Sequence, residues 1–163
     1  CAASFFGALA DLAAIGLDWD GQVVRQSDRF DRYEAAIART VERHHGTVVK
    51  HTGDGALATF PSGSEAIAAA VELRNVTKDL GLEGRTGLHV GEVEQRGEDI
   101  GGIAVNLAAR VMGEAGPGDI VVTSTVEQAS LGARVAFDDL GARSLKGIDR
   151  PWHLYVVEPR SAW

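Results

Sequence analysis

The sequence is poor in cysteine and in basic residues, and it has no long apolar run. Only one of its 163 residues is cysteine, which excludes a disulfide framework and suits a reducing compartment, so we expect a cytoplasmic protein. The 16 Lys and Arg residues are outnumbered by 23 Asp and Glu residues, giving a net charge of −7, which excludes a general nucleic-acid binder. No run reaches the roughly 20 apolar residues of a membrane span, so we expect no membrane contact.

We also expect no signal peptide, and the sequence shows no internal repeats or low-complexity linkers. The apolar segment at 1–17 has no basic beginning, and Asp11 interrupts it. Hydrophobic residues make up 45% of the chain and charged residues 24%, which is typical of an ordered globular protein. We therefore expect one domain over residues 1–163. Because the chain begins with Cys, we expect it to be cut from a longer protein.

Apolar periodicity and turn residues predict alternating strands and helices. A helix is expected where Tyr33, Ile37 and Val41 recur at helical spacing, with a solvated end at His44. A capping box formed by Ser62 opens the next helix. The remaining expected elements are helices at 103–114 and 124–130, strands at 4–12, 47–51, 56–60, 84–94, 120–123, 135–138 and 152–157, and a polar loop at 96–102.

The segment Gly53-Asp54-Gly55 lies between two of these predicted strands and indicates a β-hairpin. A hairpin requires antiparallel pairing, so the fold class is α+β, a helix-and-sheet sandwich, and not a purely parallel sheet. If the strand that ends near Asp11 lies beside this hairpin, two carboxylates converge at one sheet edge. Such a pair suits Mg²⁺ or Mn²⁺, although a turn aspartate alone is explained by turn geometry.

The segment from Asp99 to Arg110 holds a second candidate group. Two glycines open a predicted helix, and Asn106 and Arg110 are four residues apart on one of its faces. An arginine beside an asparagine can bind a phosphate and a sugar hydroxyl together. In isolation the pair is better explained as a solvated polar stripe.

Four blocks in this order resemble the catalytic domain of the class III nucleotidyl cyclases, bacterial adenylate cyclase type. They are Val49 to Gly55, Gly87 to Glu92, Asp99 to Arg110, and Leu145-Lys146-Gly147, and the resemblance covers nearly the whole chain from Asp28 onward. It implies a ferredoxin-like βαββαβ core with an antiparallel sheet. It also implies a head-to-tail homodimer, whose sites take their metal carboxylates from one subunit and their other groups from the partner.

The resemblance also implies roles for the remaining residues of the blocks. Lys50 and Asp99 match the pair that reads the purine, and Lys146 matches a lysine that binds the terminal phosphates. Asn106 and Arg110 match the catalytic pair that orients the ribose and stabilises the pentavalent phosphate. Asp54 matches the second metal aspartate of a site that holds two Mg²⁺ or Mn²⁺ ions.

The purine-reading pair indicates the substrate. Adenine offers an acceptor at N1 and a donor at its amino group, which complement the lysine Lys50 and the carboxylate Asp99. Guanine reverses both roles and would leave mismatched polar groups. The implied reaction is attack of the ribose 3′-oxygen of ATP on the α-phosphorus, which yields 3′,5′-cyclic AMP and pyrophosphate.

The first metal aspartate departs from the family pattern. Asp11 stands at the expected separation from Asp54, but the segment that follows it lacks the small hydroxyl turn of the family. A second register puts Ser4 at the metal position and would delete a metal ligand. Two alternatives therefore stay open beside an adenylate cyclase: a degenerate domain that binds nucleotide or a partner without turnover, and a guanylate cyclase.

Four large polar or aromatic side chains have simpler expected roles. His51 and His89 fall inside predicted strands, where a packed and hydrogen-bonded imidazole is expected. Trp152 and Tyr155 in the last strand are expected to lie in the core or at the dimer interface.

Overall fold

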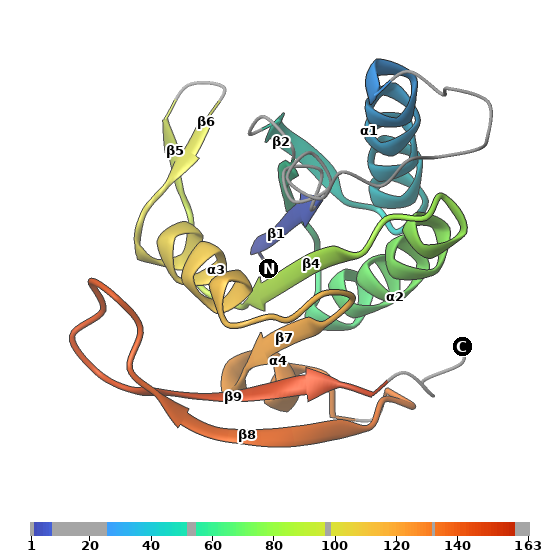
Figure 1. The fold of residues 1–163 in the computed structure, drawn as a ribbon. Helices are drawn as coiled ribbons and strands as arrows, with labels where there is room; N and C mark the ends of the chain where they lie inside the picture. The colour runs from blue at the N-terminus through green and yellow to red at the C-terminus, as the bar shows by residue number, and fades with distance from the viewer. Residues whose placement is uncertain (1, 8–25, 52–54, 97–98, 132, 159–163) are drawn as a thin grey trace.

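A seven-stranded sheet with helices on both faces forms the fold (Figure 1). The computed structural model describes residues 2–7, 26–51, 55–96, 99–131 and 133–158. The helices are α1 (Gln26–Arg43), α2 (Gly63–Asp79), α3 (Ile103–Gly113) and α4 (Ser124–Ala129). The strands are β1 (Ala2–Gly7), β2 (Thr47–His51), β3 (Gly55–Thr59), β4 (Gly84–His89), β5 (Glu94–Arg96), β6 (Asp99–Gly101), β7 (Ile120–Thr123), β8 (Phe137–Arg143) and β9 (Trp152–Val157).

The strand order of the large sheet is β2-β3-β1-β4-β7-β9-β8. The first six elements run β1, α1, β2, β3, α2, β4, and their strands lie in the order β2-β3-β1-β4. All neighbours pair antiparallel except β4 and β7, which are parallel. This is the predicted α+β fold with a ferredoxin-like βαββαβ core, and β1 lies at its centre between β3 and β4.

The two faces of the sheet carry different cores. Successive side chains of a strand point to opposite faces, and β7 shows both sides. Its residues Ile120 and Val122 belong to the larger core beneath α1 and α2, whereas Val121 belongs to the smaller core beneath α3. Figure 1 accordingly shows α2 and α3 on either side of β4.

Local sequence explains why α2 begins where it does. Ser62 is the N-cap, and its hydroxyl accepts a hydrogen bond from the backbone N–H of Glu65 at 3.2 Å, which satisfies one of the first free donors of the helix. The predicted capping position is confirmed. The helix then buries a stripe of small and branched residues, among them Ala66, Ile67 and Leu73, against the sheet.

The end of α1 is only partly as predicted. The helix ends at Arg43, and His45 takes the left-handed conformation (φ 57°) that closes it. His44 is not a solvated helix end, because its imidazole lies 2.9 Å from Glu72 and 3.4 Å from Glu65 of α2. A carboxylate pair on the neighbouring helix therefore holds this side chain, which the sequence spacing did not reveal.

Other sequence predictions also differ from the structure. The strand expected at 84–94 is interrupted, because β4 ends at His89 and β5 begins at Glu94. The expected loop at 96–102 contains β6, which pairs with β5 in a short separate hairpin. The strand expected at 135–138 is longer and begins at Phe137. His51 is exposed and lies 3.4 Å from Glu34, so it is not packed in the sheet.

Candidate active site

Helix α3 presents two of the predicted site residues to the outside. Its buried side, which includes Leu107 and Val111, packs on the sheet. Asn106 and Arg110 lie on its exposed side. The helix begins after Gly102, whose φ of 103° favours glycine, and no side chain caps this N-terminus. The structure thus keeps the Asn106–Arg110 pair outside the core, on a helix that the core fixes from beneath.

Gly87 lets α3 lie directly on β4. A Cβ at this position would stand 2.3 Å from the backbone nitrogen of Met112 and 2.5 Å from the carbonyl oxygen of Ala108. Both atoms belong to the helix backbone, so no side-chain rotation could make room. The glycine in the block Gly87 to Glu92 therefore has a packing role, because it sets the height of α3 above the sheet.

Lys50 reaches the same face through an irregularity in β2. Val48 pairs with Ala58 and Lys50 pairs with Leu57, so Val49 is the extra residue of a β-bulge. Cross-strand partners share a face, and Leu57 points away from the core that holds Ala58. Lys50 is exposed on the α3 side of the sheet. With regular pairing it would lie opposite Ala56, on the α2 side.

Asp99 is the first residue of β6, the strand that leads into α3. The backbones of β6 and β2 approach each other, with Cα atoms within 8 Å. The two strands that carry Lys50 and Asp99 are therefore neighbours within one chain, although the residues are far apart in sequence. Figure 1 shows the β5–β6 hairpin standing beyond the start of α3.

Lys146 lies in the connection between β8 and β9 and is exposed. The residue before it, Leu145, is buried in the smaller core with Leu107 and Val111 of α3. Gly147 follows with a φ of 77°, which allows the tight turn after the lysine. Lys146 is thus anchored through its neighbour to the helix that carries Asn106 and Arg110.

The two predicted metal ligands, Asp11 and Asp54, lie outside the described residues. Asp54 directly precedes β3, and Asp11 follows the end of β1 by four residues. The last described pair of these neighbouring strands is Phe6 with Gly55, so the end of β1 and the start of β3 lie at the same end of the sheet. Two carboxylates form a donor set that suits a hard divalent cation.

The described residues themselves supply no metal site. They contain no group of three His, Cys, Asp or Glu side chains that could hold an ion. Strand β1 has no acidic residue, and Ser4 lies in its interior, paired with Leu57 and Gly87. Strand β1 itself therefore supplies no metal carboxylate.

Sequence reasoning missed one cation, Arg85. Its strand position is two residues before Gly87, on the α3 side, and it pairs with Phe6 near the end of β1. The buried Nε of Arg85 has no hydrogen-bond partner in the described part of the chain. The sequence did contain a signal for it, because Arg85 lies in a predicted strand two residues before Gly87 and therefore on the same face as that glycine. Arg85 adds a cation near the end of β1 and the start of β3.

His89 is a packed and hydrogen-bonded side chain, as predicted. It is 4% exposed, and its Nδ1 lies 3.0 Å from the hydroxyl of Thr123 and 3.3 Å from that of Thr125. Burial lowers the pKa of His89 from 6.5 to about 4. At neutral pH this residue is therefore uncharged and serves as part of the support beneath α3.

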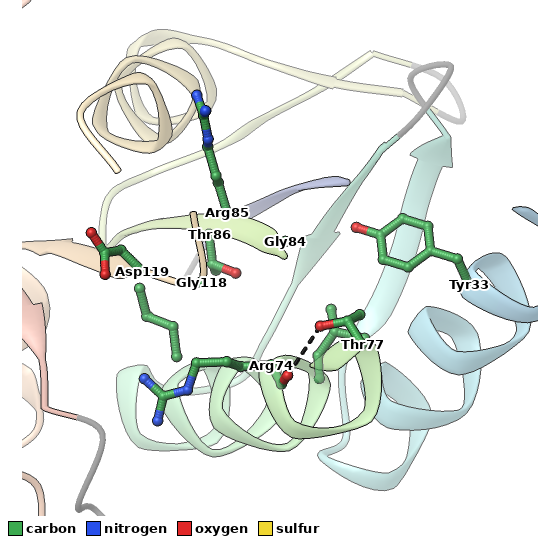
Figure 2. A pocket seen from close by; sticks show the side chains of 10 residues that line it. Tyr33, Arg74, Thr77, Gly84, Arg85, Thr86, Gly118 and Asp119 are labelled. Carbon is green, nitrogen blue, oxygen red and sulfur yellow. Dashed lines mark hydrogen bonds between the residues drawn. The ribbon is translucent and has the colours of Figure 1, made fainter. Parts of the chain in front are cut away.

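A small pocket lies on the opposite face of the sheet (Figure 2). Arg74 and Thr77 of α2, Tyr33 of α1 and Asp119 before β7 surround it, and its volume of about 10 Å³ is enough for one water molecule. Figure 2 shows the Arg85 side chain pointing away from Arg74 and Thr77, across β4. The pocket is therefore separate from the predicted site residues.

The pocket continues into an open groove of about 420 Å³ along the C-terminal half of α2 and the end of β9. Burial lowers the pKa of Arg74, and the nearby charge of Asp119 opposes this shift. Lys78 and Glu83 add one charge of each sign to the rim, so the groove favours neither anions nor cations.

Comparisons with known proteins agree with this arrangement. A relative from Rhizobium meliloti (strain 1021) with the printed name "Putative adenylate cyclase 3" is 30% identical over 138 residues, which cover 79% of this chain. The chain spans only 24% of that relative's length. A solved structure of an adenylate/guanylate cyclase/hydrolase from Silicibacter pomeroyi is 26% identical, with a TM-score of 0.77, and the match covers 97% of this chain and 96% of that one.

Two further findings complete the comparison. No model of a known protein family matches the chain. A match of 34 residues is 74% identical to a glutamyl-Q tRNA(Asp) synthetase from Nocardia farcinica, but it covers 21% of this chain and 11% of the synthetase, too little to carry an activity. No helix in the described part of the chain combines the length and apolar character needed to cross a bilayer.

The similarity over almost the full length of a solved cyclase confirms the resemblance that the four sequence blocks predicted. The chain has the fold of the class III adenylate and guanylate cyclase catalytic domains.

Proposed function

We propose that the chain is the catalytic domain of an adenylate cyclase that converts ATP to 3′,5′-cyclic AMP and pyrophosphate. The observation that carries this proposal is that the predicted residues in the described part of the chain lie on elements at or beside the α3 face of the sheet. Asn106 and Arg110 are exposed on α3, the strands of Lys50 and Asp99 are neighbours, and Leu145 anchors Lys146 to α3. A cytoplasmic location suits both an ATP-consuming enzyme and a chain with one cysteine.

These residues divide the work of binding. Lys50 donates to N1 of adenine and Asp99 accepts from the amino group, which selects ATP over GTP. Lys146 binds the terminal phosphates. Asp11 and Asp54 would hold two Mg²⁺ or Mn²⁺ ions, whose chemistry at such sites is activation of a hydroxyl and neutralisation of phosphate charge. Arg85 lies beside the end of β1 and adds a phosphate-binding cation there.

The reaction forms one bond and breaks one bond. The 3′-oxygen of the ribose attacks the α-phosphorus, the bond to the β-phosphate oxygen breaks, and the proton of the 3′-hydroxyl passes to solvent. Asn106 orients the ribose for this attack. The guanidinium of Arg110 neutralises the charge that grows on the α-phosphoryl oxygens, an effect that acts most strongly in the transition state.

The open position of Asn106 and Arg110 supports a shared site. They lie on an exposed helix face and line neither the pocket nor the groove described on the α2 side. A head-to-tail homodimer would cover this face with the carboxylate end of a second copy. Each site would then combine Lys50, Asp99, Asn106, Arg110 and Lys146 of one chain with Asp11, Asp54 and Arg85 of its partner.

The direct test is an assay of purified protein with ATP and Mn²⁺ for cyclic AMP and pyrophosphate. Arg110→Ala should lower turnover by about 10²- to 10³-fold, the usual effect of removing one transition-state donor, with unchanged thermal stability because the residue is exposed. Arg39→Ala, at an exposed arginine of α1, is the matched control and should retain full activity. An Arg110→Ala variant with full activity would contradict the mechanism.

Mixing two inactive variants tests the shared site. Arg110→Ala and Asp54→Ala disable different halves, so a mixed dimer regains one intact site. With random exchange of subunits, activity should return to about a quarter of the wild-type level. No recovery, in a mixture shown to form mixed dimers, would exclude sites built from two chains.

An assay in which ATP and GTP compete determines which purine base the site prefers. Lys50→Ala and Asp99→Ala should each reduce the preference for ATP, whereas a wild-type preference for GTP would identify a guanylate cyclase instead.

A second candidate function is a domain that binds nucleotide without turnover. The observation in its favour is that β1 (Ala2–Gly7) contains no acidic residue, although the first metal carboxylate is expected at the end of that strand. Calorimetric binding of ATP with no product at high Mn²⁺ would establish this function. Product formation that Asp11→Ala abolishes would exclude it and assign the ligand.

A further inference from the structure

A three-residue stack joins two distant parts of the chain beside the start of α3. The ring centroids of His89 and Trp152 are 5.1 Å apart, and the two planes are nearly perpendicular at 84°. The guanidinium carbon of Arg150 lies 4.7 Å from the centre of the Trp152 ring. The stack therefore combines an edge-to-face aromatic contact with a cation–π contact.

The indole of Trp152 is not placed for hydrogen bonding. Its Nε1 atom is buried and has no hydrogen-bond partner among the described residues. A buried donor without a partner lowers stability, so an apolar side chain would fill the space at less cost. A large aromatic face that can bind both an imidazole and a guanidinium is what tryptophan supplies best.

The two sides of the stack belong to the segments that carry predicted substrate residues. His89 is the last residue of β4, which leads through β5 to Asp99 on β6. Arg150 and Trp152 end the connection from β8 that carries Lys146. Tight packing fixes the His89 side, since a Cβ on Gly91 would lie 2.8 Å from His89 Nε2 and 3.0 Å from Ala104 Cβ.

Among the described residues, Leu145 and Ile148 also attach the 144–151 connection to the smaller core, Leu145 as a buried side chain and Ile148 as a partly buried one. Leu145 is buried beneath α3, and the Ile148 N–H donates to the Leu145 carbonyl at 3.0 Å. The residues between this turn and β9 are exposed. The stack is thus the anchor of the connection nearest to β9, at the opposite end from Leu145.

We propose that Arg150, Trp152 and His89 form a positioning element that holds the 144–151 connection against the end of β4 and so fixes Lys146 for the nucleotide. The role of Lys146 in this inference rests on the proposed function. The stack touches no reacting group, and its effect passes through the backbone of the connection.

Hydrogen exchange of the full chain tests the positioning without any need for activity. Trp152→Leu and Arg150→Ala should speed amide exchange at 144–149 by about three- to tenfold, with little change in α2 and β3. This factor is the free energy of one aromatic or cation–π contact expressed as a ratio of exchange rates. Trp152→Phe keeps an aromatic face and should restore most of the protection. Unchanged exchange at 144–149 in both Trp152→Leu and Arg150→Ala would overturn the proposal.

Kinetics separate a positioning role from a general loss of stability. In an active enzyme, Trp152→Leu should raise the KM for ATP by about three- to tenfold and alter kcat less, because Lys146 binds phosphates in the ground state as well. Tyr155→Phe on the other face of β9 is the matched control and should leave KM unchanged. A lowered melting temperature with unchanged KM would show a merely structural stack and would also overturn the proposal.

The two proposals fail in different ways. If wild-type protein makes no cyclic nucleotide, the proposed function fails, and the exchange rates at 144–149 still decide whether the stack holds the connection. If the protein is active and these rates do not respond, only the positioning role is wrong.

Discussion

The helices α2 and α3 lie on opposite faces of one sheet and are built differently. Helix α2 has 17 residues, a serine cap and a long buried stripe shared with α1. Helix α3 has 11 residues, an uncapped start at Gly102 and a smaller core, and it exposes Asn106 and Arg110. The α2 face is thus organised for stability, and the α3 face exposes the groups that the proposed chemistry needs.

The two faces share the same strands, so neighbouring residues of one strand belong to different faces and have different roles. In β4, Leu88 is fully buried on the α2 side, whereas Gly87 and His89 lie beneath α3. Substitutions at adjacent positions should therefore affect stability and activity in different proportions, and four changes test how separate the faces are.

The largest effect is expected for Gly87→Val. The added side chain would collide with the backbone of α3 at Met112 and Ala108, and no rotamer relieves the clash, so we expect no folded protein by circular dichroism. Gly113→Ala on the same helix is the matched control. A Cβ there meets nothing within 4 Å, and stability should rise by about 0.5–1 kcal/mol. A folded and active Gly87→Val variant would show that α3 can move away from the sheet.

Leu88→Ala should produce a large effect confined to stability. Loss of a fully buried leucine from the core beneath α2 should lower the free energy of unfolding by about 2–5 kcal/mol in urea titrations. Turnover per folded molecule should stay at the wild-type value, because no group on the α3 face changes. A fall in kcat/KM at temperatures where the variant is fully folded would show that the faces are coupled.

Acid should weaken the α3 face through His89. Its pKa is about 4 in the folded protein and 6.5 in the unfolded chain, so the unfolded chain binds more protons between these values. Stability should therefore fall as the pH drops from 6.5 towards 4, by about 3 kcal/mol in total. His89→Gln should flatten this part of the pH profile, whereas His45→Gln, at an exposed histidine, should not. Equal profiles for His89→Gln and wild type would exclude a buried neutral imidazole.

The smallest effect is expected for Ser62→Ala. It removes the side-chain cap of α2 and should lower the free energy of unfolding by about 1 kcal/mol, with no change in nucleotide affinity. Ser64→Ala, two residues further and without a capping bond, is the control. A change in KM for ATP would mean that the cap of α2 influences the opposite face.

Much of the fold follows from local patterns. The Asp-Gly turn signal predicted the β2–β3 hairpin, and the segment after Val41 predicted the end of α1. Both signals depend on apolar spacing and turn residues, which act over only a few positions. The hairpin of β5 and β6 was missed because each strand has three residues and no apolar alternation. Its pairing depends on its position beside β2 and at the start of α3, which no local pattern contains.

The candidate site was predictable as a set of residues but not as an arrangement. The spacing of Asn106 and Arg110 placed both on one exposed helix face, and the structure agrees. Nothing near Arg85 in the sequence shows that its Nε is buried beneath α3, and nothing near Trp152 shows that its ring meets His89. These contacts join segments far apart in the chain, so they appear only when the sheet assembles.

The bulge at Val49 has a consequence for sequence comparison. Inside a strand, a one-residue gap in an alignment is normally penalised, because it reverses every side chain that follows. At this position the extra residue is absorbed by the bulge, and Lys50 still lies opposite Leu57. A chain that lacked Val49 could present its lysine on the same face with regular pairing. A gap at this one point is therefore physically correct, and an ungapped alignment would assign the role of Lys50 to the wrong residue.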